Sequence, residues 1–163
     1  MSARVSFSDF RSIMDEYLNE YRLNPNLEAL EISGIYDLFP DQSSSDKDIQ
    51  KAAAWPDRWS NSERPGIYAI FDASLELLYV GKASMGSYLG ARLSSYFQGS
   101  PKEPCKVLHT WVNHEGETVT PRYVITVAVP KETPWEAPAL EEYLIDQLKP
   151  PSNRMGIRTK STG

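Results

Sequence analysis

One acidic residue stands out because it lies where apolar side chains are expected. In a helix predicted to end at Leu148, Leu140, Leu144 and Ile145 recur at helical spacing, and Glu141 falls on the same stripe. A carboxylate on a buried stripe loses hydration, which is costly unless a cation or hydrogen-bond donors compensate. The pattern therefore predicts that Glu141 meets either a metal ion or an arginine. A structural salt bridge or a snorkelling side chain is the alternative interpretation.

Further groups with chemical potential occur in short motifs on either side of Glu141. The motifs are Gly66-Ile67-Tyr68, Tyr79-Val80-Gly81-Lys82, Arg92-Leu93-Ser94-Ser95-Tyr96-Phe97, and then Leu144-Ile145, Pro150 and Asn153. In order and spacing this set resembles the GIY-YIG nuclease family, and it is most similar to the branch found in bacterial excision-repair incision enzymes. The resemblance covers residues 65–156 and does not extend to the first sixty residues.

The resemblance implies an endonuclease that hydrolyses phosphodiester bonds of nucleic acid, expected to be DNA. It implies one Mg²⁺ or Mn²⁺ ion per site with Glu141 as its protein ligand, because these ions prefer oxygen donors and keep waters and phosphate oxygens as their other ligands. The residues that it assigns to catalysis are Tyr68, Tyr79, Lys82, Arg92, Glu141 and Asn153, and those expected to contact the substrate include Lys82, Arg92 and Tyr96.

The expected roles follow from what phosphodiester cleavage requires. Arg92 would hold the phosphate and offset charge in the transition state through its planar guanidinium. Tyr68 and Tyr79 would orient or deprotonate the attacking water, and for the second role cations such as Lys82 must lower a phenol pKa from its usual value near 10. The role expected of Asn153, holding the site together by hydrogen bonds, is implied by the resemblance alone.

The two tyrosines offer an internal check on this interpretation. Apolar runs at 67–71 and 77–80 flank a turn at 72–74 and predict a β-hairpin. Side chains alternate between the faces of a strand, so two tyrosines that line one site must face each other directly or diagonally. The hairpin must then have an even-numbered loop or a bulge. Aromatic residues also favour strands for structural reasons alone.

The segment between Gly81 and Arg92 departs from the family pattern. It is a few residues longer than in the repair enzymes, and it contains Gly86 and Gly90. We therefore expect a loop of different shape, and with it a change in substrate contact.

Few other side chains offer a base or a nucleophile. Several family members carry a histidine one helical turn after the arginine, but that position is Tyr96 here. His109 and His114 lie outside the motifs and are expected to be ordinary polar residues. Cys105 is the only cysteine, which excludes an internal disulfide and a multi-cysteine metal site.

The fold predicted from these patterns is α+β. We expect a helix at 8–22, the hairpin, a helix at 87–97, a strand at 122–129 and a last helix from about 136 to 148. This order favours a small antiparallel three-stranded sheet flanked by helices, as in the GIY-YIG fold. We divide the chain into a partly helical N-terminal extension at 1–60, whose role is open, and a nuclease domain at 61–163.

The composition limits how nucleic acid can be bound. The 163 residues carry a net charge of −5, so contact with a polyanion requires a local basic patch. Arg154, after the last helix, is expected at such a rim, although a solvated tail is the alternative. No apolar run approaches the roughly 18 residues that span a bilayer, and no signal sequence is present, so we expect a cytoplasmic protein without membrane contact.

Two alternatives remain open at this stage. A non-catalytic nucleic-acid-binding or interaction module on the same fold would be favoured by replacement of Glu141 or Arg92, and neither is replaced. The chain could also act as a homodimer or within a larger nuclease assembly that supplies target choice. The sequence distinguishes neither DNA from RNA nor a specific site from a branched or damaged one.

Overall fold

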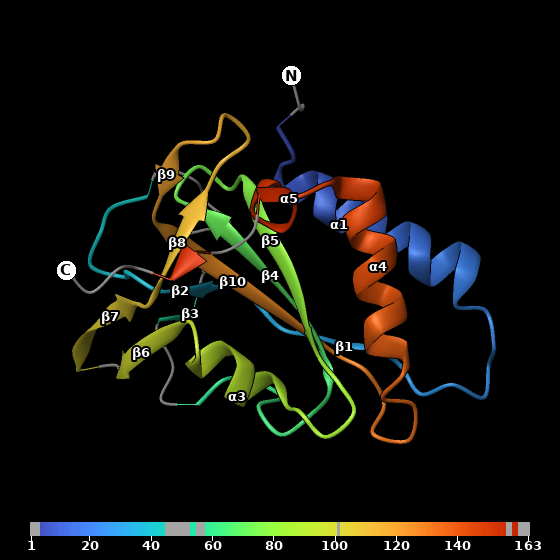
Figure 1. The fold of residues 1–163 in the computed structure, drawn as a ribbon. Helices are drawn as coiled ribbons and strands as arrows, with labels where there is room; N and C mark the ends of the chain where they lie inside the picture. Colours follow the sequence, from blue (N-terminus) through green and yellow to red (C-terminus); the bar gives the residue numbers. More distant parts are fainter. Residues whose placement is uncertain (1–3, 45–52, 55–57, 101, 156–157, 160–163) are drawn as a thin grey trace.

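A six-stranded sheet forms the centre of the fold (Figure 1). The computed structural model describes residues 4–44, 53–54, 58–100, 102–155 and 158–159, with the backbone path alone for 53–54, 154–155 and 158–159. The strand order is β3-β2-β10-β4-β5, and β1 also pairs with β10. The strand bounds are β1 Glu31–Ile32, β2 Tyr36–Asp37, β3 Ala53–Ala54, β4 Gly66–Asp72, β5 Leu77–Ala83 and β10 Pro121–Ala128. The long strands β10, β4 and β5 are antiparallel, and every residue of β10 is buried.

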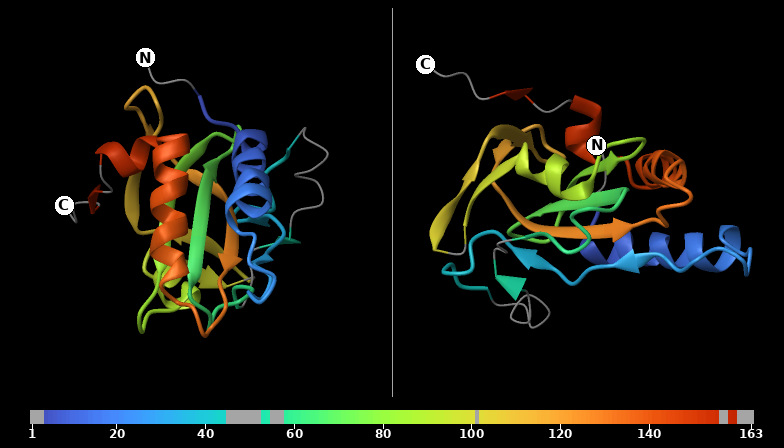
Figure 2. Two further views of the ribbon diagram at one scale, coloured as in Figure 1. Left: turned by 90° about the vertical axis from the view of Figure 1, so that its right-hand side faces the viewer. Right: turned by 90° about the horizontal axis from the view of Figure 1, so that it is seen from below.

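Each face of the sheet has its own apolar cluster. Helices α1 and α4 cover one face, while α3 and smaller hairpins cover the other (Figure 2). The bounds of these elements are α1 Phe7–Glu16, the π-helical turn η1 Tyr17–Tyr21, α3 Leu89–Ser94, β6 Phe97–Ser100, β7 Glu103–Val107, β8 His109–Val112, β9 Thr118–Val119, α4 Glu136–Leu148, α5 Pro151–Met155 and β11 Arg158–Thr159. No helix in the described part of the chain is long and apolar enough to cross a membrane.

Helix α1 begins where the sequence offers a cap. The Ser6 side chain accepts a hydrogen bond from the Asp9 amide, and the Asp9 carboxylate accepts one from the Ser6 amide, so both satisfy otherwise unpaired donors. Phe7 and Phe10 then pack edge-on against Phe71 of β4, with ring centroids 5.5 and 5.7 Å away. The helix expected at 8–22 is thus confirmed as α1 followed by η1.

A buried ion pair joins the N-terminal segment to the start of α4. Arg22 Nε lies 2.5 Å from Glu136 Oε1, and the Tyr17 hydroxyl donates to the same oxygen at 2.9 Å. Both charged side chains are almost fully buried, at 7% and 11% exposure, so losing either one would leave a buried charge without its partner. The N-terminal segment therefore helps to fix the helix that carries Glu141.

The α+β class and its antiparallel sheet are confirmed, but the sheet is larger than expected. Strands β1, β2 and β3 come from the N-terminal extension and add to the predicted three-stranded sheet. The predicted last helix is confirmed as α4, and the strand at 122–129 as β10. The helix expected at 87–97 is shorter, because α3 ends at Ser94 and Phe97 already begins β6.

Gly66 packs so tightly against β10 that it provides a test of the sheet. A Cβ at this position would lie 2.1 Å from the carbonyl oxygen of Val127, and backbone cannot yield as a flexible side chain can. We predict that Gly66→Ala lowers the free energy of unfolding by about 1–3 kcal/mol, as overpacking usually does. Gly34→Ala is the matched control, since nothing lies within 4 Å of its added Cβ. Urea denaturation followed by tryptophan fluorescence measures both, and equal stability of the two variants would refute this account of the strand contact.

Candidate active site

The predicted catalytic residues meet at the edge of the sheet formed by β5. Tyr79 and Lys82 lie on β5 itself, Arg92 comes from α3 on one face, and Glu141 comes from α4 on the other. An open cavity of about 380 Å³ lies between them, lined by Tyr79, Lys82, Ser84, Ser87, Arg92 and Glu141. Ser84 and Ser87 were not predicted, and the sequence signals them only by their place in the lengthened segment before Arg92.

Lys82 is the cation that approaches Glu141. Its Nζ lies 3.8 Å from Glu141 Oε1, and the two side chains are 41% and 21% exposed. Burial raises the pKa of the Glu141 carboxyl, while the charges of Lys82 and Arg92 act in the opposite direction. A lysine thus takes the place in which an arginine was expected. With so much exposure, the pair is a weak contribution to stability and leaves the carboxylate available.

The hairpin places the two motif tyrosines on one face, as predicted. Tyr68 pairs with Gly81 and Tyr79 with Ile70, so the tyrosines are diagonal neighbours with ring centroids 6.2 Å apart. The expected irregularity is present, because the register shifts between Ile70 and Phe71. A Cβ on Gly81 would lie 2.4 Å from Cζ and Oη of Tyr68, so the ring occupies the space of the missing side chain.

Tyr68 and Tyr79 nevertheless differ in access to the cavity. Tyr79 lines it, whereas Tyr68 is fully buried. The Tyr68 hydroxyl donates to the Tyr96 hydroxyl at 3.0 Å, and Arg92 Nη2 donates to the same Tyr96 oxygen at 3.3 Å. Tyr96 is itself buried and is not among the cavity-lining residues. Tyr96 therefore lies behind Arg92, where its hydroxyl can orient the guanidinium.

Burial also changes the acid–base character expected of the phenols. Desolvation raises the pKa of Tyr68, and the neighbouring Tyr96 adds to the effect. Burial likewise raises the pKa of Tyr79, with further contributions from Tyr96 and the Glu141 carboxylate. Arg92 opposes both shifts and does not reverse either. The sequence interpretation, in which cations lower a phenol pKa, therefore does not describe this structure, because it could not include the cost of desolvation.

A cluster of aromatic rings supports the tyrosines from behind. Trp111 of β8 packs edge-on against Tyr79 and Tyr96, with ring centroids 5.5 and 5.4 Å away. His109 lies edge-on to Tyr96 at 5.2 Å, and its Nε2 is 3.1 Å from the Ser95 carbonyl oxygen. His109 thus lies close to the site without lining the cavity.

The side chain of Asn153 binds the backbone of β5. Its Nδ2 donates to the Val80 carbonyl oxygen at 2.8 Å, and its Oδ1 accepts from the Val80 amide at 2.9 Å. The adjacent Ser152, fully buried, makes an equivalent pair with Val112 of β8, accepting from its amide at 3.1 Å and donating to its carbonyl at 2.9 Å. Two consecutive side chains of α5 therefore join two strand edges. The part played by Ser152 was not apparent from the sequence, while the side chain of Arg154 lies outside the described residues.

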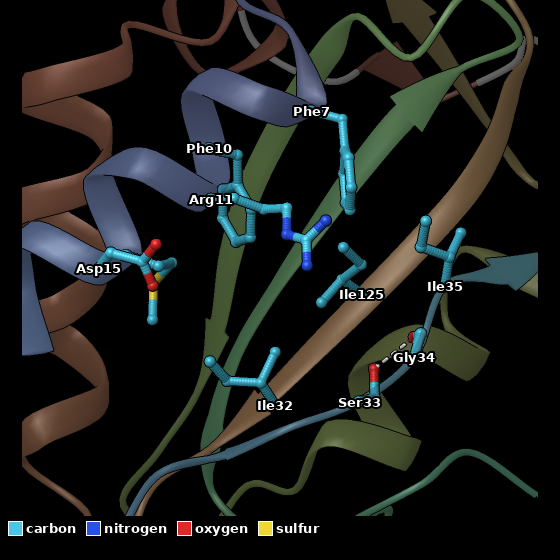
Figure 3. A pocket seen from close by; sticks show the side chains of 10 residues that line it. Phe7, Phe10, Arg11, Asp15, Ile32, Ser33, Gly34, Ile35 and Ile125 are labelled. Atoms are coloured by element: carbon cyan, nitrogen blue, oxygen red, sulfur yellow. Dashed lines mark hydrogen bonds between the residues drawn. The ribbon is translucent and has the colours of Figure 1, made fainter. Parts of the chain in front are cut away.

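A second cavity of about 380 Å³ lies on the α1 face of the sheet, between α1 and the connection from β1 to β2 (Figure 3). Its walls are mainly apolar, and Arg11 and Asp15 of α1 are its charged side chains. It includes none of the predicted catalytic residues. Groups suited to phosphodiester chemistry therefore gather at the β5 edge and not in this cavity.

Comparison with known proteins agrees with the motifs. The family described as a UvrC-like GIY-YIG domain matches residues 64–154. The UvrABC system protein C of Chromohalobacter salexigens is 37% identical over 92 residues, and that of Pseudomonas aeruginosa strain LESB58 is 40% identical over 95 residues; each match covers 56% of this chain and 13% of the relative. The protein of the same name from Aliivibrio salmonicida is 37% identical over 95 residues, which cover 58% of this chain and 13% of the relative. The matches thus span only a small part of these relatives, and no solved structure matches the chain significantly.

The raised pKa of Tyr68 predicts how the protein responds to alkali. Because the folded pKa lies above the ordinary value of 10.0, the stabilising effect of the neutral phenol is complete below pH 10.0 and is lost as the pH rises beyond it. We predict that the phenolate absorbance of the wild type minus that of Tyr68→Phe stays at zero up to pH 10.0 in the folded protein. Urea midpoints should fall more steeply above that pH in the wild type than in the variant. Phenolate formation by Tyr68 at lower pH, with the fold intact, would contradict the prediction.

Proposed function

The chain belongs to the UvrC-like GIY-YIG domain family, and we propose that it is a metal-dependent endonuclease that hydrolyses phosphodiester bonds of DNA at the β5 edge. The family supports a nuclease-type function on nucleic acid. The observation that carries the finer proposal is the convergence of Glu141, Arg92, Lys82 and Tyr79 on one open cavity from three different elements. A substrate phosphate that enters there meets two cations, a carboxylate and a phenol.

Glu141 is the residue that would hold Mg²⁺ or Mn²⁺. No group of three or more His, Cys, Asp or Glu side chains suited to a metal occurs among the described residues, so an ion at Glu141 would take its remaining ligands from water and phosphate oxygens. That ligand set suits Mg²⁺, which often keeps several waters and binds through one or two carboxylates. A bound ion would supply Lewis-acid stabilisation of the phosphate charge. The Glu141 side chain is partly exposed and lies 3.8 Å from Lys82, which is compatible with this role.

Arg92 and Lys82 would bind the phosphate. The guanidinium of Arg92 lines the cavity and is held from behind by the Tyr96 hydroxyl, which fixes the orientation of its planar fork. Lys82 has a flexible side chain, so its ammonium group can leave Glu141 and bind a phosphate oxygen while the backbone stays in place. Together they would offset the negative charge that grows on the phosphate in the transition state.

Tyr79 would contact the attacking water, and Tyr68 would act only through its neighbours. Tyr79 is the motif tyrosine that lines the cavity, and its raised pKa keeps it a neutral hydroxyl that can accept or donate a hydrogen bond. Tyr68 is buried and linked to Arg92 through Tyr96, so it serves as a positioning residue. Asn153 is also a positioning residue, because its side chain binds the backbone between Tyr79 and Lys82.

The biological setting is inferred from the relatives. The proteins matched are named UvrABC system protein C, a name that refers to one component of a system. We therefore propose that DNA is the substrate and that further protein modules or a second copy of the chain supply target choice. Repair and restriction of DNA are both compatible with the site.

A plasmid-cleavage assay tests the proposed activity. The full chain is incubated with supercoiled, linear and single-stranded DNA in Mg²⁺, Mn²⁺ or EDTA, and Glu141→Gln is compared with Glu142→Gln, its exposed neighbour on the same helix. We expect metal-dependent nicking that falls by at least about 100-fold in Glu141→Gln, because a ligand of the proposed metal ion is lost, and that is unchanged in Glu142→Gln. Retained cleavage in Glu141→Gln would exclude the proposed metal site. A folded wild type that binds DNA and cuts none of these substrates would instead indicate a binding module.

A further inference from the structure

The loop Ser84–Tyr88, between β5 and α3, is fixed at both ends although its tip is exposed. It leaves β5 directly after the hairpin, and the Ser87 amide donates to the Ser84 carbonyl across a turn at 3.2 Å. At its other end the Leu89 amide donates to the Arg64 carbonyl at 3.0 Å, and Leu89 itself is fully buried. The loop therefore presents its side chains from a fixed base.

Two large apolar side chains project from this loop. Met85 is 72% exposed and Tyr88 is 49% exposed, and they are among only six large hydrophobic residues with high exposure in the described part of the chain. Met85 has a positive φ of 51°, an uncommon conformation for a side chain of this size. Single exposed apolar residues are ordinary, but two on one short loop beside a polar cavity suggest a surface that binds a ligand.

The loop separates the catalytic cavity from a third, smaller cavity. Met85 and Tyr88 line a cavity of about 260 Å³ together with Pro134 and Lys131 of the segment before α4. Ser87 lines both this cavity and the catalytic one. Figure 1 shows the two segments at the same end of the molecule, the green loop next to the orange one that leads into α4. Because Ser87 is shared, the loop borders the catalytic cavity directly.

The chemistry of this third cavity suits one planar ring attached to a charged backbone. Its volume lies below the ~300–1,000 Å³ of sites for drug-sized ligands, so it suits a single ring system. Lys131 is exposed there, and the nearby Glu63 already pairs with Arg58 at 2.6 Å, so the lysine is available to a phosphate. Tyr88 offers an aromatic face, and base stacking on aromatic side chains does not require a particular base.

We propose that Tyr88, with Met85, is a stacking platform for an unpaired nucleobase adjacent to the scissile phosphate, with Lys131 contacting the phosphate of the same strand. In a duplex both faces of each base are covered by neighbours, so a loop aromatic stacks only where a strand is single or a base is turned out. The platform therefore selects DNA that is unpaired at the cut. This inference rests on the proposed nuclease function, because it places the substrate in the same cavity.

The test uses the full-length chain and DNA that contains 2-aminopurine, a fluorescent base quenched by stacking. Oligonucleotides with the probe at successive positions beside an unpaired segment are bound in EDTA to the wild type, Tyr88→Ala and Tyr88→Phe. Tyr21→Ala, which removes a tyrosine that is 62% exposed on η1, is the control. We expect the probe to be quenched at one position in the wild type, Tyr88→Phe and Tyr21→Ala. In Tyr88→Ala the quenching should be lost and affinity for unpaired DNA should fall about 5- to 150-fold, the range for one base stack.

A second readout separates this inference from the nuclease proposal. In Mg²⁺, Tyr88→Ala should lose the preference for unpaired over fully paired DNA while keeping metal-dependent cleavage. If Tyr88→Ala quenches the probe and prefers unpaired DNA as the wild type does, the stacking inference is wrong and the nuclease proposal is unaffected. If quenching depends on Tyr88 but the wild type cuts no DNA, the platform is supported and the nuclease proposal fails.

Discussion

The ring of Tyr68 fills the space that a side chain on Gly81 would occupy, and the geometry of the site depends on this contact. It requires position 81 to lack a Cβ, and it fixes which residues of β4 and β5 stand opposite each other. A slip of one residue would turn Tyr79 to the α4 face of the sheet, away from Arg92. Gly66 adds a second constraint of the same kind by allowing β10 to approach β4. Gly81 is therefore explained by the ring of Tyr68, Gly66 by the approach of the β10 backbone, and the positions of the two motif tyrosines by the register of the hairpin.

Because β5 is the outer strand of its sheet, side chains from both faces can meet there. Arg92 and Glu141 come from helices on opposite faces and converge around the edge, which an inner strand would prevent. An exposed edge also carries unpaired backbone groups that invite pairing with another chain. The carboxamide of Asn153 forms hydrogen bonds with the amide and carbonyl groups of Val80, as a neighbouring strand would. The β5 edge is therefore open to the cavity at Tyr79 and Lys82, while Asn153 covers the backbone groups of Val80.

What could be predicted from sequence is what depends on nearby residues. The hairpin, α1, α4 and the diagonal tyrosines follow from spacing along the chain, and the structure confirms them. Strands β1 and β2 are too short to leave a periodic signal, and they form because β10 offers a distant edge. The raised pKa values of the phenols could not be predicted from sequence for the same reason. Tyr68 packs against Tyr96, and Tyr96 packs against Trp111, both far along the chain, so no local pattern reveals this packing.

The two motif tyrosines differ in what could change their charge. Burial dominates the raised pKa of both, but the negative charge of Glu141 contributes to that of Tyr79 and is not among the main causes for Tyr68. Neutralising Glu141 would remove that contribution to the pKa of Tyr79. Arg92 already acts in the lowering direction on Tyr79. Tyr79 is therefore the motif tyrosine whose pKa depends on the charge of Glu141. Tyr68 stays neutral, and the hydrogen bond that it donates to Tyr96 keeps Arg92 in place.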